Sequence, residues 1–174
     1  MEPTLIELRT FTHTDLPTIR QTLIDIHAHI PEYPADDEFA QRFPWFVDHW
    51  GKNPGFVCVM GYDGPTPVGY AYGAPLTEGR EWWRGQLDPV PEKTVTFAVS
   101  ELMVLPRWRK TGTAERLHAT LLHGRPEALA VLLVDTTHPK VQSAYEEWGY
   151  SKVGEQQPFP DSPVYAVMLR PLPA

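Results

Sequence analysis

The sequence predicts a mixed α/β domain. Its 174 residues suit one domain or two small ones. Hydrophobic residues make up 42% of the chain and aromatic residues 11%, so a packed core is expected and global disorder is excluded. Segments with strand composition alternate with segments of helical periodicity in the order β-α-α-β-β-β-α-β-α-β-β. No repeat or low-complexity linker interrupts this order, so we predict a single domain over residues 1–174.

The N-terminal part is predicted to hold a short strand and two helices. The strand covers residues 5–8, and a helix begins at residues 14–17, where a hydroxyl, an acid and a proline follow one another. Its apolar residues recur at helical spacing: Leu16, Ile19, Leu23, Ile26 and Ile30. A second helix follows residues 35–37, and its apolar face comprises Phe39, Phe43, Phe46, Val47 and Trp50. Pro44 should kink or divide this helix, and Gly51 suits the position just past its end.

The rest of the chain is predicted to alternate between strands and two further helices. Residues 56–60 and 68–72 form a hairpin around turn residues 62–65, and residues 74–93 are a long connection. The remaining elements are a strand at 94–104, a helix at 111–123, a strand at 128–134, a helix at 139–148, and strands at 150–153 and 164–169.

Charge and composition exclude several classes of function. The chain has 15 Lys and Arg against 22 Asp and Glu, a net charge of −7, which argues against a general nucleic-acid binder. No run reaches the ~18 apolar residues of a membrane span. The first residues lack a basic and an apolar region, so no signal peptide is expected and a cytoplasmic protein is the default. A single cysteine, Cys58, allows no intrachain disulfide and no cysteine-based zinc site, and we expect it to be buried and inert.

Residues 101–114 are the segment most suggestive of chemistry. A strand ends at Pro106, a basic turn follows, and Gly112 opens a helix. Backbone N–H groups at a helix start carry partial positive charge and suit a pyrophosphate. Arg107, Arg109 and Lys110 add three cations beside this turn. On spacing alone, an ordinary strand–turn–helix with solvated cations explains the segment equally well.

Four motifs carry a resemblance to a known family. Residues 109–114, Arg-Lys-Thr-Gly-Thr-Ala, resemble the R-x-x-G-x-G/A signature of GCN5-related N-acetyltransferases, with alanine at the second glycine position. Residues 8–17 are similar to the family's first strand and helix start, residues 63–71 to its hairpin, and residues 145–150 to its Y-E-x-x-G-F/Y motif. The matches follow family order and cover nearly the whole chain.

The resemblance implies a fold and a co-substrate. The fold is a mostly antiparallel sheet, splayed between its fourth and fifth strands and flanked by about four helices. Acetyl-CoA would enter the splay as co-substrate, and no metal is implied. The backbone of Met103 and Val104 would bond the pantetheine arm and the thioester carbonyl. The implied cofactor-binding residues are Met103, Val104, Arg109, Lys110, Thr111, Gly112, Thr113, Ala114 and His138.

Two side chains match catalytic positions of the family. Tyr145 falls where the family's tyrosine protonates the departing thiolate, and a phenol of pKa ~10 is a suitable donor. The alternative is a core tyrosine on an apolar helix face. Glu101 lies on the fourth strand, near where related enzymes use a carboxylate to take a proton from the ammonium group. A solvent-facing or ion-paired carboxylate is the alternative.

His138 is a departure from the family, which often has asparagine seven residues before the tyrosine. A histidine there has four open roles: bonding the cofactor, capping the short helix, transferring a proton, or simply starting the helix without catalytic duty. We favour the last.

A second motif, Asp25-Ile26-His27-Ala28-His29, resembles the D-x-H-x-H metal motif of amidohydrolases. That motif needs a strand, whereas helical periodicity turns His27 and His29 about 200° apart. We therefore predict no metal site.

The acceptor is expected to be an amine, first a small molecule and second a protein N-terminus or lysine. For Trp82 and Trp83 the sequence favours two alternatives equally: they form a wall of the acceptor site, or they pack onto the core. Acidic residues on the presumed acceptor side would attract a cationic amine: Glu32, Asp36, Asp37, Glu38, Glu78 and Glu81. The rival functions are an acyl-CoA-binding module without turnover and an interaction domain unrelated to CoA. The resemblance is also compatible with a homodimer.

Overall fold

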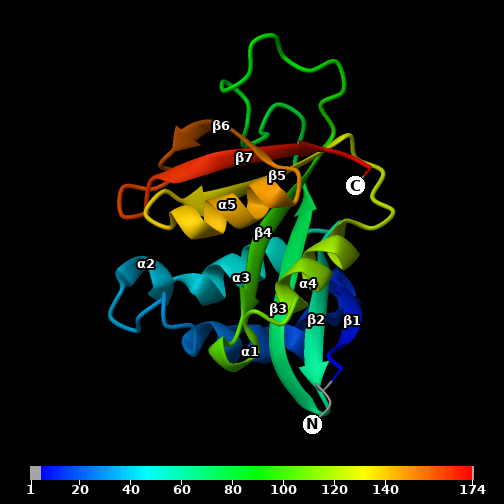
Figure 1. Ribbon diagram of the computed structural model, residues 1–174, viewed down its shortest axis with the longest axis vertical. Helices are drawn as coiled ribbons and strands as arrows, with labels where there is room; N and C mark the ends of the chain where they lie inside the picture. The colour runs from blue at the N-terminus through cyan, green and yellow to red at the C-terminus, as the bar shows by residue number, and fades with distance from the viewer. Residues whose placement is uncertain (1–4, 174) are drawn as a thin grey trace. The chain divides into compact units, whose positions relative to one another are not determined.

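Seven strands form one sheet in the order β1-β2-β3-β4-β5-β7-β6 in the computed structural model, which describes residues 5–173 (Figure 1). The strands are β1 Glu7–Thr12, β2 Val57–Asp63, β3 Thr66–Pro75, β4 Thr96–Val104, β5 Leu129–Asp135, β6 Ser151–Gln156 and β7 Tyr165–Pro171. The pairs β1–β2, β2–β3, β5–β7 and β6–β7 are antiparallel. β4 and β5 are parallel, and their register covers only residues 96–98 and 129–131. The predicted splay between the fourth and fifth strands is thus confirmed.

The described residues also form five α-helices, in the predicted order along the chain. They are α1 Leu16–Ala28, α2 Glu38–Gln41, α3 Phe43–Gly51, α4 Thr113–Leu122 and α5 Pro139–Glu147, with short 3₁₀ turns at His13–Asp15 and Pro106–Trp108. Pro44 does divide the second predicted helix, because α2 ends at Gln41 and Pro44 lies in the first turn of α3. None of the described helices is both long and apolar enough to cross a bilayer.

Several predicted boundaries are wrong. β2 runs to Asp63, into the predicted turn at residues 62–65, and β3 covers residues 66–75 rather than 68–72. β1 covers residues 7–12 rather than 5–8, because its limits are set by backbone pairing with β2 and not by its few apolar residues. Gly51 is the last residue of α3 rather than the residue beyond it. A Cβ at Gly51 would lie 2.5 Å from Leu16 Cδ1, so the glycine lets α3 pack closely on α1 with Leu16 in its present rotamer.

The chain folds into two compact units, and the single domain predicted over residues 1–174 stays a prediction. The first unit contains residues up to 74 and residues 101–123. The second contains residues 75–100 and those from 124 onward. β4 therefore begins in the second unit and ends in the first.

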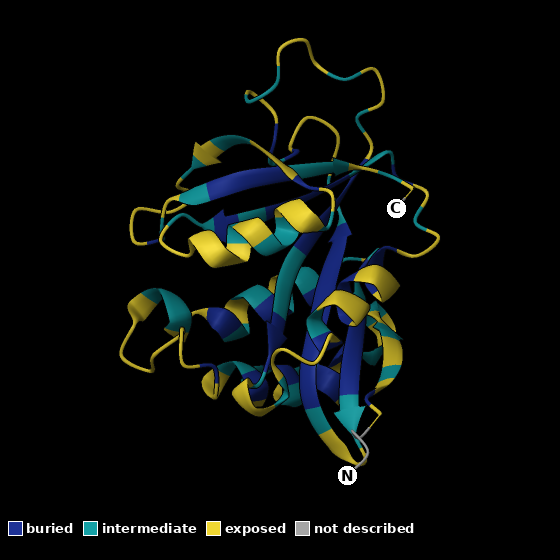
Figure 2. Ribbon diagram, viewed as in Figure 1, coloured by how far each residue is buried: buried dark blue, intermediate teal, exposed yellow. Residues whose placement is uncertain are grey.

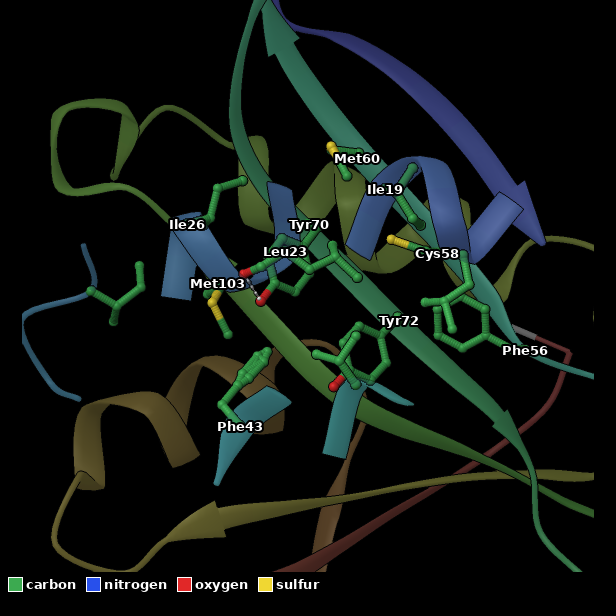
Figure 3. Close-up of a cluster of buried hydrophobic side chains, with 13 residues drawn as sticks. Ile19, Leu23, Ile26, Phe43, Phe56, Cys58, Met60, Tyr70, Tyr72 and Met103 are labelled. Carbon is green, nitrogen blue, oxygen red and sulfur yellow. Dashed lines mark hydrogen bonds between the residues drawn. The ribbon is translucent and has the colours of Figure 1, made fainter. Parts of the chain in front are cut away.

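The first unit carries helices on both faces of β2 and β3. The face of Cys58 and Met60 packs against α1 and α3, with Tyr70, Tyr72 and Leu23 in the same buried cluster (Figure 3). α4 packs against β2 on the other face: a Cβ at Gly61 would lie 3.8 Å from Leu117 Cδ2. β2 and β3 are accordingly buried along most of their length, whereas the outer side of α4 is exposed (Figure 2). This packing fixes the end of β4 and the start of α4.

Two buried side chains anchor the long connection within the second unit. Trp83 has no exposed surface, and its indole Nε1–H donates to Thr96 Oγ1 at 2.9 Å. Glu81 is buried with its carboxylate paired to Arg84 Nε at 2.6 Å, and this pairing lowers the pKa of Glu81. The connection is therefore anchored at residues 81–84, although it contains no regular element.

Candidate active site

The end of β4 is held against β3 by a glycine and a backbone hydrogen bond. A Cβ at Gly69 would lie 2.6 Å from Met103 O and 3.0 Å from Val104 Cα, so only glycine fits there. The Leu105 N–H donates to Val68 O at 2.8 Å. The side chains of Met103 and Val104 are buried. The predicted cofactor strand is thus firmly positioned within the first unit.

Glu101 lies two residues before Met103 on the same strand, among buried neighbours. Burial raises the pKa of its carboxyl group from its ordinary 4.5 to about 8. Within residues 5–173, its carboxylate takes part in no hydrogen bond or ion pair. A carboxyl group without a partner, titrating near neutrality, can accept and release a proton under ordinary conditions.

Tyr70 lies close enough to Glu101 for the two groups to influence each other electrostatically. Burial, then Tyr72 and then Glu101, raise the pKa of Tyr70 well above its ordinary value of 10. Its hydroxyl donates to Leu23 O of α1 at 3.1 Å (Figure 3). The phenol therefore stays protonated beside the Glu101 carboxyl group.

The turn between β4 and α4 is built from two residues in the left-handed conformation. Lys110 has φ 61° and Gly112, which precedes α4, has φ 82°. Thr111 Oγ1 donates to Trp108 O at 2.6 Å, and Trp108 Nε1 donates to Asp63 Oδ2 at 2.9 Å. One of these hydrogen bonds lies within the turn, and the other joins the turn to the β2–β3 hairpin.

The shape and charge of this turn suit a diphosphate. Apart from Gly112 itself and its two chain neighbours, no described residue has an atom within 4 Å of the place where a Cβ on Gly112 would stand, so the backbone is open on that side. The first amide groups of the ten-residue helix α4 follow directly. Arg107, Arg109 and Lys110 are exposed beside them. The residues present therefore fit the anionic group that the sequence predicts here.

Arg109 differs from the other two cations because its guanidinium group is bonded within the protein. Its Nε–H donates to Val104 O at 3.0 Å. Its Nη1 and Nη2 donate to Glu32 Oε1 and Oε2 at 2.6 and 3.2 Å. Glu32 is thus already paired, and its charge is matched by an arginine.

Tyr145 and His138 belong to the second unit. The Tyr145 ring lies edge-on to the rings of Trp148 at 5.2 Å and Tyr150 at 5.7 Å, and the residue is partly buried on α5. His138 precedes α5, is exposed, and has Nε2 3.7 Å from Asp135 Oδ2. Its side chain does not cap the helix, which removes one of the four predicted roles.

A family model described as "Acetyltransferase (GNAT) family" matches residues 20–150. The chain belongs to this family. The resemblance found in the four motifs is therefore confirmed, and the protein is a GNAT acetyltransferase by family.

Solved structures with the GNAT fold superimpose on nearly the whole chain. Arabidopsis thaliana NAA60 in complex with acetyl-CoA is 16% identical, with a TM-score of 0.69, covering 98% of this chain and 100% of that one. PH1933 from Pyrococcus horikoshii is 18% identical, with a TM-score of 0.67 and the same coverage. The ribosomal-protein-S18-alanine N-acetyltransferase from Escherichia coli is 14% identical, with a TM-score of 0.65, covering 96% and 94%. No curated protein sequence matches the chain.

Burial and ion pairing bear on two expectations about the acceptor side of this GNAT chain. Trp83 cannot contribute to an acceptor wall because its side chain is completely buried, whereas Trp82 is partly exposed. Of the predicted acidic residues, Glu32 and Glu81 are ion-paired, and the Asp37 carboxylate accepts a hydrogen bond from Phe39 N–H at the start of α2. These three carboxylates are engaged locally.

The two histidines of the D-x-H-x-H motif have structural contacts. His27 is stacked on Tyr33 at 4.7 Å and lies edge-on to Phe43 at 3.9 Å, and burial lowers the pKa of His27 to about 4. His29 Nδ1 lies 2.8 Å from Asp25 O. Among the described residues, no group of three metal-binding side chains is present.

One residue of the site, Tyr70, and one ion pair, Arg109–Glu32, were missed from the sequence. Tyr70 had a usable signal, because alternation along the hairpin places residues 70 and 72 on the face that receives α1. The Arg109–Glu32 pair had none, since the two residues lie 77 positions apart and only the fold brings them together.

Proposed function

We propose that the protein transfers the acetyl group of acetyl-CoA to a primary amine of a small molecule, with both substrates bound together. The observation that carries this proposal is the Glu101 carboxyl group, which has a pKa of about 8 and lies two residues before the predicted donor strand end. An amine must lose its proton before it attacks, and an uncompensated carboxylate of this pKa is suited to take it.

The donor would be held by the backbone of the first unit. The amide groups of Thr111, Gly112, Thr113 and Ala114 would bind the pyrophosphate, with Lys110 adding positive charge. The backbone of Met103 and Val104 would bind the pantetheine arm and the thioester carbonyl. A fixed N–H group there lowers the energy of developing negative charge without reorganisation. The close contact of Gly69 with Met103 O supports this role because it keeps that backbone rigid.

Tyr145 would protonate the departing thiolate. A phenol is an appropriate acid for this step because its ordinary pKa is ~10. We expect Tyr145→Phe to lower kcat by about 10²-fold or more, with little change in acetyl-CoA affinity, since general acid catalysis contributes about 10²–10⁴-fold. Stopped-flow kinetics and calorimetric titration separate the two effects. An unchanged kcat would remove Tyr145 as the acid and leave it a packing residue.

The test of the proposed function is thiol release from acetyl-CoA with a panel of polyamines, aminoglycosides, amino acids and peptides. With the best amine, the wild-type rate should rise with pH up to about 8, the pKa of Glu101. Glu101→Gln should remove this rise of the rate with pH. The matched control is Glu92→Gln, which changes an exposed glutamate outside the site and should leave the profile unchanged.

Peptides are the second candidate class of acceptor. The Escherichia coli neighbour is named for an alanine of a ribosomal protein, which supports including peptide N-termini in the panel. Acetyl-CoA binding without turnover by any amine would instead favour a binding module. A cytoplasmic location and a homodimer stay predictions, and light scattering measures the dimer.

A further inference from the structure

A cation that no carboxylate neutralises lies at the end of α5. Arg170 of β7 donates from Nη1 to Trp148 O, directly after the last residue of the helix, at 2.7 Å. Within residues 5–173 its guanidinium group forms no ion pair, and its Nε–H is buried without a hydrogen-bond partner. Because a partly buried charge without a counter-ion is costly, other groups must stabilise this one.

The surroundings of Arg170 attract a cation without a carboxylate. Trp148 O lies at the C-terminal end of a helix, where carbonyl groups carry partial negative charge. The guanidinium carbon lies 5.7 Å from the centroid of the Tyr150 ring, whose π face also attracts a cation. A Cβ on Gly149 would lie 3.6 Å from the same carbon, and Gly149 has φ 96°, a common conformation just past a helix end. Arg170 is therefore close to each of the three residues that follow α5.

Two of these residues also limit the position of the Tyr145 ring. It lies edge-on to Trp148 at 5.2 Å and to Tyr150 at 5.7 Å, and the Tyr150 N–H donates to Tyr145 O at 3.1 Å. The helix backbone places the Cα of Tyr145, whereas the torsions of its side chain depend on the neighbours that the ring meets. The place of the phenol group thus depends on Trp148 and Tyr150, among other neighbours.

The helix that carries Tyr145 is loosely packed, whereas the strand that carries Arg170 is not. No residue of α5 is fully buried, and much of the helix is exposed (Figure 2). Arg170 pairs with Ala130 of β5, and β7 lies between β5 and β6 in the sheet. A helix with little buried surface gains little hydrophobic stabilisation, so a polar anchor at its end contributes a larger share of its fixation.

We propose that Arg170 is a positioning residue: it joins the end of α5 to β7 and, through Trp148 and Tyr150, holds the Tyr145 phenol group in place. All four residues belong to the second unit. The inference rests on the proposed function, which assigns to this phenol the proton for the departing thiolate. Arg170 touches neither substrate in this role, so it affects kcat only through Tyr145.

The kinetic test combines Arg170→Gln with Tyr145→Phe. With the amine that gives the fastest thiol release, Arg170→Gln should lower kcat by about 5- to 50-fold, because a misplaced catalytic group can cost up to about 10²-fold. The dissociation constant of CoA should stay within about threefold of wild type. In the Tyr145→Phe background the same substitution should change kcat by less than about twofold, since the hydroxyl that it displaces is already absent. A general loss of structure would instead lower kcat by the same factor in both backgrounds.

Two further variants complete the kinetic test. Lys152→Gln is the matched control, because it removes an exposed cation from the neighbouring strand β6 and should leave kcat unchanged. Arg170→Lys keeps the charge but loses the planar guanidinium group, so it should lower kcat less than Arg170→Gln does. It also serves as the test variant if Arg170→Gln is too unstable to purify.

Fluorine NMR of protein labelled with 3-fluorotyrosine observes the Tyr145 ring without any turnover. The chain has seven tyrosines, and the signals of Tyr145 and Tyr150 are identified by their loss in the two Tyr→Phe variants. Arg170→Gln should shift or broaden both signals and leave that of Tyr70, in the first unit, unchanged. Lys152→Gln should move none of the three.

Two results would overturn the inference. One is an equal fall of kcat on Arg170→Gln with and without the Tyr145 hydroxyl. The other is an unchanged Tyr145 signal in Arg170→Gln. An unchanged kcat in Tyr145→Phe alone would instead count against the proposed acid, and the NMR measurement would still decide whether Arg170 positions the ring.

Discussion

The carboxyl group of Glu101 has a pKa of about 8 in the folded protein and an ordinary value of 4.5. The folded state binds this proton more tightly than the unfolded chain does. The free energy of unfolding is therefore highest below about pH 4.5, and it decreases as the pH rises towards 8. Each pKa unit corresponds to ~1.36 kcal/mol, so the loss is at most about 5 kcal/mol.

Glu101→Gln should therefore stabilise the protein at pH 9 by a few kcal/mol relative to wild type, and by much less at pH 5. Urea unfolding at the two pH values measures this difference. The exposed Glu92→Gln variant should show no such pH-dependent gain. Equal gains for Glu101→Gln at both pH values would show that burial does not control the titration of this carboxyl group.

Lys110 combines a positive charge with a left-handed backbone, φ 61°. This conformation costs a residue with a Cβ about 1 kcal/mol, and glycine avoids the cost. Lys110→Gly and Lys110→Ala lose the same charge, so both should weaken CoA binding to a similar extent. Lys110→Gly should be more stable than Lys110→Ala by about 0.5–1 kcal/mol, measured by urea unfolding. Equal stabilities would contradict the proposed cost of the backbone conformation.

At the scale of secondary-structure elements, Gly69 sets the approach of β3 to the end of β4. A Cβ at this position would meet backbone atoms of Met103 and Val104, which cannot rotate away. We expect Gly69→Ala to destabilise the protein by about 1–3 kcal/mol and to weaken CoA binding, because the donor strand must shift.

Gly51→Ala is the matched comparison for this substitution. The three atoms nearest to its Cβ would all belong to the Leu16 side chain, which can change rotamer. Gly51→Ala should therefore leave CoA affinity unchanged even where stability falls. Equal losses of CoA affinity in the two variants would show that the contact at Gly69 is not specific to the donor strand.

Local patterns predicted the elements well where the side chains themselves determine the structure. Four of the five apolar residues with helical spacing at 16–30 lie buried on α1, and Pro44 divides α2 from α3. The turn at Gly112 and the start of α4 follow from local glycine and helix chemistry. β1 was misplaced because an exposed strand carries little hydrophobic signal and is defined by its partner.

Contacts between distant segments could not be predicted from the same patterns. The sequence gives no sign that Glu32 pairs with Arg109, that Trp83 binds Thr96 inside the second unit, or that burial shifts the pKa of Glu101. Each of these depends on the packing of elements separated in the chain. The residue types of the site were therefore predictable, but their partners and protonation states were not.

The whole molecule carries a net charge of −7, so it repels a polyanionic ligand such as CoA at long range. Binding must therefore depend on the short basic turn and the start of α4, where positive charge is locally concentrated. Pantetheine shares the arm of CoA but lacks the pyrophosphate and the nucleotide. Comparing the binding of CoA and of pantetheine therefore separates the contribution of the turn to affinity from that of β4.

Ligand binding to the folded state alone raises the free energy of unfolding, by about 2.7 kcal/mol at a concentration 100 times the dissociation constant. For a chain of this size, this corresponds to a rise in Tm of roughly 5–10 °C. We expect such a rise with CoA, a much smaller one with pantetheine at the same concentration, and a loss of the difference as salt is increased, because screening weakens the contacts to the phosphates. Differential scanning fluorimetry measures all three. Equal shifts with CoA and pantetheine would show that the turn at residues 109–114 does not bind the pyrophosphate, and no shift with either would refute the proposed donor.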